Sequence, residues 1–340
     1  MGNKICRKNE PFFCFLLSVA ESSDIMPNIG IDDSLLKYSG LNSAAELDNS
    51  VKQTLMDMGR RSPDFLGSLG SDLAAFDAVP NAVGLGALVL SLVLEFTIRA
   101  LDKQEKEDST FDVVRRVFAE EKASGVRDSM EEYLKRLAMY LHQPTEMLEE
   151  TNRLEKQLSE QLTCLKNSML HDKKMSSRSM KHWTNGAAFH LQMLIHAARR
   201  KLQNTTKDEE KLKVHVASII TVLNRYQYDL QELLKLYKIY KNSTIKLFYK
   251  PSSYMMEVVA GYAWVIKDNE LRKQTVVYCG EEMVGTSDAY IDYMFDHWSL
   301  IKQLNRYFDE LKDNLQELIT QNFEFNMQKV LPVSDNHSAL

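Results

Sequence analysis

One uncharged run constrains the fold of this chain more than any other feature. It extends from Ala78 to Leu94 (AVPNAVGLGALVLSLVL), in a protein of 340 residues of which 26% are charged. A helix from Ala78 to Ile98 would be about 30 Å long, close to the thickness of the hydrocarbon core of a bilayer. The uncharged part falls just short of the roughly 18 residues that indicate a membrane-spanning helix. Such a run needs cover, either from the rest of the protein or from lipid.

A second apolar segment, Phe65 to Val79, precedes the part of this run that begins at Ala82, and Pro80-Asn81 marks a turn between the two. Glycines on both arms allow the two backbones to pack closely. The sequence therefore predicts an apolar helical hairpin over residues 65–98. Its apolar element is represented by Leu85, Leu88, Leu92 and Phe96. Two interpretations remain open: the hairpin is the core of a bundle, or it is sheltered in the soluble form and meets lipid in the active one.

The rest of the chain favours long amphipathic helices. Glycine (13) and proline (7) are scarce, which disfavours β-sandwiches and α/β folds with their many turns. Two heptad patterns predict long helices that pack at shallow crossing angles, as in coiled coils. The first pattern has Val216, Leu223, Leu230 and Tyr237 with Ile219, Tyr226, Leu233 and Tyr240; the second has Met294, Ile301, Phe308 and Leu315 with Leu304, Leu311, Leu318 and Phe325. The predicted fold class is all-α: an elongated bundle of long amphipathic helices with one apolar helical hairpin. The run Gln274 to Cys279 is strand-like but too isolated to predict a sheet.

The first twenty residues admit two interpretations that exclude each other. A basic start, a short apolar stretch over residues 12–17 and the small residues Ser18 and Ala20 are typical of a secretory signal peptide. Gly2 and Cys6 instead fit a weak signal for N-myristoylation. We expect a secreted or membrane-associated protein in the first case, and a cytoplasmic one if the leader is not a signal. The domains expected from the sequence are this leader (1–20), an N-terminal helix with the hairpin (21–108), a long-helix bundle (109–330) and a disordered tail (331–340).

The sequence contains no recognised catalytic or cofactor-binding motif. The eight histidines lack metal-ligand spacing, and no CxxC pair is present. We therefore expect no enzyme, no cofactor and no metal site. If the leader is removed, Cys164 and Cys279 are the two remaining cysteines and a disulfide between them becomes possible. The net charge of −5 argues against a nucleic-acid-binding protein.

A basic and aromatic segment, Leu233 to Lys250 (LLKLYKIYKNSTIKLFYK), has no acidic residue. Lysine side chains can reach lipid phosphates while tyrosines occupy the headgroup region, so anionic lipid is the partner that this composition suggests. The candidate lipid-facing residues are Lys235, Lys238, Lys241, Lys246 and Lys250. The other interpretation is an ordinary bundle helix whose lysines form its solvated face.

An apolar element (Phe65 to Ile98) followed by long heptad helices resembles the layout of α-helical pore-forming proteins of the cytolysin A type. The order of segments is also similar to that of teleost Rapunzel-type proteins. The resemblance covers most of the chain but includes no residue motif, so no functional residue follows from it. It implies a non-enzymatic membrane-interacting protein, pore-forming or lipid-binding. The alternative is a helical scaffold that associates with itself or with another helical protein, the apolar segment then being core.

Overall fold

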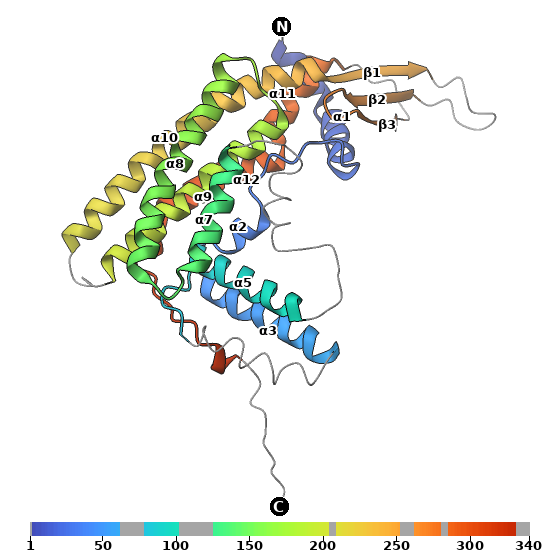
Figure 1. The fold of residues 1–340 in the computed structure, drawn as a ribbon. Helices are drawn as coiled ribbons and strands as arrows, with labels where there is room; N and C mark the ends of the chain where they lie inside the picture. Colours follow the sequence, from blue (N-terminus) through green and yellow to red (C-terminus); the bar gives the residue numbers. More distant parts are fainter. Residues whose placement is uncertain are drawn as a thin grey trace, which may run out of the picture. The chain divides into compact units, whose positions relative to one another are not determined.

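The computed structural model describes residues 2–61, 78–101, 125–203, 209–251, 262–279 and 285–330. These residues are mostly helical, which confirms the coarse prediction, but they also form a small sheet (Figure 1). The helices are α1 (Gly2–Ser22), α2 (Asp33–Lys37), α3 (Ser43–Arg61), α5 (Leu85–Leu101), α7 (Gly125–Met139), α8 (Pro144–His171), α9 (Ser177–Leu202), α10 (Glu209–Thr244), α11 (Ser287–His297), α12 (Ser299–Asp313), α13 (Leu315–Thr320) and the 3-10 turn η2 (Met327–Lys329). The first arm of the predicted hairpin falls largely outside the described residues, as does the tail from residue 331.

The sheet has three antiparallel strands in the order β1–β2–β3. These are β1 (Ile245–Pro251), β2 (Tyr262–Asp268) and β3 (Lys273–Cys279). The strand-like run noted in the sequence is thus an edge strand with partners. Strand β1 follows α10 without a break, at Ile245, so the basic segment 233–250 is part helix and part strand.

The chain forms two compact units, with α8, α9, α10 and α12 contributing residues to both. Unit 1 comprises residues 1–30, 166–181 and 227–307, and unit 2 comprises residues 31–165, 182–226 and 308–340.

In unit 1, helix α1 packs against α11 and β3. Its side chains Phe12, Phe13 and Leu16 are buried. The Phe12 ring lies edge-on to Trp264 of β2 at 5.4 Å between centroids, and the Phe13 ring lies 6.2 Å from that of Tyr290. The segment that the sequence marks as a leader is therefore a core helix of this unit in the structure.

In unit 2, the helix enclosed on nearly every side is α9. Its large side chains Trp183 and Phe189 are fully buried. Gly186 is pressed so closely against Val126 and Leu162 that a Cβ atom there would lie 2.6 and 2.7 Å from their side chains. Because α9 is enclosed, its polar residues must find partners inside the protein.

The first heptad pattern matches the buried face of α10, in which Ile219, Leu223, Tyr226, Leu230, Leu233 and Tyr237 are all buried. The second pattern is buried as well, but it runs through three helices, α11, α12 and α13, with breaks at Trp298 and Asn314, and its last residue, Phe325, lies after α13 in a β-bridge with Val79.

Candidate functional site

The apolar element singled out by the sequence is helix α5, and its two halves differ in burial. Leu85 and Leu88 are buried, Leu92 is half-buried, and Phe96 is 55% exposed. The helix lies beside α3 and also contacts α7, all within unit 2 (Figure 1). The first half is therefore core, while the second half buries Leu94 and Ile98 on one face and leaves Phe96 exposed on another.

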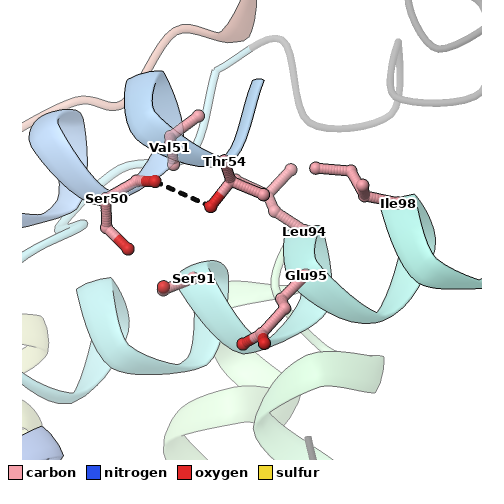
Figure 2. A pocket seen from close by; sticks show the side chains of 7 residues that line it. All are labelled: Ser50, Val51, Thr54, Ser91, Leu94, Glu95 and Ile98. Atoms are coloured by element: carbon pink, nitrogen blue, oxygen red, sulfur yellow. Dashed lines mark hydrogen bonds between the residues drawn. The ribbon is translucent and has the colours of Figure 1, made fainter. Parts of the chain in front are cut away.

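A small pocket lies between α3 and the second half of α5, which both contribute side chains to its lining (Figure 2). Its lining is mixed, with hydroxyl groups beside aliphatic side chains: Ser50, Val51, Thr54, Ser91, Leu94, Glu95 and Ile98. The Thr54 hydroxyl donates to the carbonyl of Ser50 at 2.8 Å, within its own helix. The hydroxyl groups at this contact reduce the apolar area that α3 and α5 bury against each other, while the aliphatic side chains Val51, Leu94 and Ile98 are buried there.

The start of α5 is tied to the C-terminal part of unit 2. Val79 forms an antiparallel bridge with Phe325, and the Ala82 amide donates to the Phe323 carbonyl at 2.8 Å. Gly84 has φ +53°, a left-handed conformation that glycine adopts without strain. These contacts fix the entry of the chain into α5.

Arg199 of α9 reinforces this connection, and we call its set of hydrogen bonds the Arg199 clamp. Its Nε donates to the Leu318 carbonyl at 2.6 Å, its Nη1 to the Val83 carbonyl at 3.3 Å and its Nη2 to Oε1 of Gln321 at 3.3 Å. All three acceptors are uncharged, and Arg199 is buried. Burial lowers the pKa of Arg199 to about 9.

Further polar groups of α9 surround the clamp. A Cβ atom on Gly84 would lie 3.3 Å from Oε1 of Gln192, and one on Gly86 would lie 3.7 Å from Cε1 of His196. Burial, and then the charges of Arg199 and Arg200, lower the pKa of His196 to about 3. Four buried atoms here form no hydrogen bond with the described residues: Asn81 Nδ2, Gln192 Oε1, His196 Nδ1 and Arg200 Nη1. Sequence reasoning missed this cluster, because scattered histidines and arginines on one helix resemble a solvated face.

The five candidate lysines occupy different environments. Lys235 pairs with Glu232 at 2.7 Å on the surface of α10, and Lys238 pairs with Asp292 at 2.9 Å. Lys241 is fully buried. Lys246 is exposed on β1, whereas the side chain of Lys250 lies outside the described residues.

The buried ammonium of Lys241 belongs to a closed network in unit 1. It lies 2.5 Å from Oδ2 of Asp268 and 3.1 Å from Oε2 of Glu270. The Ser177 hydroxyl lies 2.5 Å from Oε2 of Glu270 and 2.7 Å from the Tyr237 hydroxyl. Burial alone would raise the pKa of Glu270, but hydrogen bonds from Ser177 and the charge of Lys241 lower it. Because its charges and hydroxyls are paired, this network fixes the β2–β3 turn to α9 and α10 rather than serving as a lipid-facing site.

Cys164 is exposed and is a free thiol, so the structure does not form the disulfide that the sequence allowed with Cys279. Among the described residues, no three His, Cys, Asp or Glu side chains gather closely enough to hold a metal ion. In the same part of the chain, no helix has both the length and the hydropathy needed to cross a membrane.

Comparisons with other proteins add no assignment: no protein-family model matches the chain, and no curated protein or solved structure matches it significantly.

Proposed function

We propose that this protein is a non-enzymatic, membrane-interacting helical protein of the lipid-binding or pore-forming kind. In this proposal the apolar helical hairpin includes α5, is carried by an elongated bundle of helices, and is sheltered in the soluble form. It meets lipid after α3 separates from α5.

The observation that supports the proposal is the uneven cover of α5. Phe96 is 55% exposed and Leu92 is half-buried, on a helix with no charge before Glu95. Over residues 43–57, where burial is described, the neighbouring α3 buries a narrow apolar stripe, Leu47, Val51 and Leu55. A cover of this kind, with hydroxyl groups in the contact, is easier to displace than an apolar core. Transfer of Leu or Val from water to the membrane interior is favourable by about 0.3 to 0.6 kcal/mol per residue, whereas Glu95 opposes it.

Flotation with vesicles and release of an entrapped dye test the proposal. We expect the wild-type chain to float with vesicles that contain 30% phosphatidylserine. Replacement Phe96→Asp should weaken this association by about a hundredfold, the cost of a carboxylate near the centre of a bilayer. Circular dichroism should remain unchanged because Phe96 is exposed in the fold.

The control is Met56→Asp, which changes an equally exposed apolar residue of α3 (58%). It should associate with vesicles as the wild type does. Failure of the wild type to float with any vesicle contradicts the proposal.

The second candidate is a helical scaffold that binds another helical protein or a second copy of itself. It is favoured by the complete burial of Leu85 and Leu88 and by the Arg199 clamp, which together make the first half of α5 part of the core. Under this alternative, Phe96→Asp weakens a protein complex, and neither the wild type nor any variant binds vesicles.

A further inference from the structure

The two faces of the three-stranded sheet differ in character. One face packs on α1 through the contact of Phe12 with Trp264, and on the residues just after α1 through the pair of Lys273 with Asp24 at 2.7 Å. Strand residues alternate between faces, and the registers Lys246↔Lys267↔Gln274 and Phe248↔Val265↔Val276 place these residues together on the opposite side. We call this side the outer sheet face; its described side chains are Lys246, Phe248, Ala263, Val265, Lys267, Gln274, Val276 and Tyr278, of which Ala263 and Val265 on the central strand are buried.

The outer sheet face exposes apolar side chains on both of its edge strands. Phe248 of β1 is 42% exposed, and Val276 and Tyr278 of β3 are 41% and 64% exposed. Large apolar side chains exposed along the edge strands of one face indicate a surface that contacts another molecule.

The same face is positively charged. Lys246 and Lys267 are directly opposite each other on neighbouring strands, and both are exposed. Like charges in that position repel each other. Neither has an ion-pair partner among the described residues, and the only strand carboxylate there, Asp268, is buried on the other face with Lys241. An anionic partner would attract both lysines and so offset their mutual repulsion.

Resting on the proposed function, we propose that the outer sheet face is the surface that docks on membranes rich in anionic phospholipid. The apolar strip of Phe248, Val276 and Tyr278 enters the interfacial region, and Lys246 and Lys267 meet lipid phosphates. An aromatic and aliphatic strip beside lysines fits the bilayer interface, where apolar and charged groups are both accommodated. A nucleic acid would satisfy the lysines but not the apolar strip. The assignment differs from the basic segment noted in the sequence, because Lys235, Lys238 and Lys241 are paired with carboxylates elsewhere.

Vesicle flotation of the full chain with Lys246→Gln and Lys267→Gln together tests this docking surface. We expect about a thirtyfold loss of affinity for vesicles with 30% phosphatidylserine, from the attraction of two lysines near an anionic surface. The matched control is Lys302→Gln with Lys312→Gln, which removes the same charge from two exposed positions of α12 and should change affinity less than twofold. The inference is overturned if the two double variants lose affinity equally. It is also overturned if the wild type binds vesicles of phosphatidylcholine alone as tightly as vesicles that contain phosphatidylserine.

A second measurement reports contact directly. Tryptophan introduced by Phe248→Trp should be quenched by brominated lipid, whereas Ile239→Trp, at a 68% exposed site on α10, should not. Absence of quenching at position 248 in vesicle-bound protein also overturns the inference. If the wild type floats with vesicles and the double replacement Lys246→Gln with Lys267→Gln binds equally well, this docking surface is wrong but the proposed function is not contradicted. Absence of wild-type flotation removes both.

Discussion

The ammonium nitrogen of Lys241 lies 2.5 Å from Oδ2 of Asp268, and neither side chain is accessible to solvent. The other carboxylate oxygen of Asp268 accepts hydrogen bonds from the amides of Glu270 and Leu271, at 2.8 and 3.3 Å. One buried pair therefore links the long helix α10 to the turn that joins β2 and β3. Its contribution to the free energy of unfolding can be measured separately from that of the surface pairs on the same helix.

Replacement Lys241→Met should lower the free energy of unfolding by about 3 to 5 kcal/mol, because it leaves the Asp268 carboxylate buried without a counter-charge. Urea denaturation followed by circular dichroism measures the change. The control Lys235→Met breaks an exposed pair with Glu232 and should be indistinguishable from wild type. Adding Asp268→Asn to Lys241→Met should restore part of the lost stability. No restoration would contradict the assigned role of the pair.

Replacement Gly84→Ala should destabilise unit 2 by about 1 to 3 kcal/mol. Gly84 has φ +53°, and an added Cβ would lie 2.6 Å from Nη1 of Arg199, so the Arg199 clamp must shift. Gly40→Ala is the control, since no atom lies within 4 Å of the added Cβ and no positive φ is required there. Differential scanning calorimetry should show a lower Tm for the first variant and an unchanged or slightly higher Tm for the second. Equal behaviour of the two would refute the strained turn.

Stability should fall as the pH drops from about 6.5 toward 3, because burial lowers the pKa of His196 to about 3. In this interval the unfolded histidine binds a proton and the folded one does not, so acid favours the unfolded state. The expected loss between pH 7 and pH 4.5 is about 2 to 3 kcal/mol from this residue. Urea midpoints at both pH values measure it.

His196→Gln should remove this part of the pH dependence, whereas His142→Gln, at an exposed position in the same unit, should keep it. An unchanged pH dependence in His196→Gln would show that His196 is accessible to protons in the folded state.

Phe13→Ala should cost about 3 to 5 kcal/mol, since the ring is fully buried between α1 and α11. Phe15 lies on the other side of the same helix and is 48% exposed, so Phe15→Ala serves as the control and should cost under about 1 kcal/mol. Chemical denaturation of the two variants gives the comparison. Similar losses of unfolding free energy in the two variants would show that α1 is not packed as described. Intact-mass measurement of the expressed wild type checks separately whether α1 is retained.

Sequence periodicity predicted the helices better than it predicted the sheet. In α10, residues such as Leu223 and Leu230 repeat with the spacing of a helix face, so local pattern and burial agree. Strand β1 was missed because it continues a helical segment directly at Ile245, and its partner is β2, residues 262–268. The three strands follow one another in the chain, but their pairing leaves little trace in local periodicity.

The candidate site could be predicted only in part, because only some of it is continuous in the sequence. The apolar run around α5 is continuous in sequence and was found. The Arg199 clamp joins residues that are far apart along the chain, whereas the network around Lys241 and the outer sheet face depend on strands that helical periodicity does not reveal. Lysines 235 to 250 looked equivalent in the sequence, whereas the fold buries Lys241 and exposes Lys246.

The Arg199 clamp also sets an order of events during synthesis. Arg199 follows Val83 by 116 residues and precedes Leu318 by 119 residues. At 5 to 20 residues per second, a ribosome needs about 10 to 50 s after making Val83 to supply the last partner of the clamp. For that time α5, the most apolar of the helices that the structure describes, has no anchored beginning. It is then available to chaperones and to any membrane beside the ribosome, before the C-terminal residues that hold it have been made.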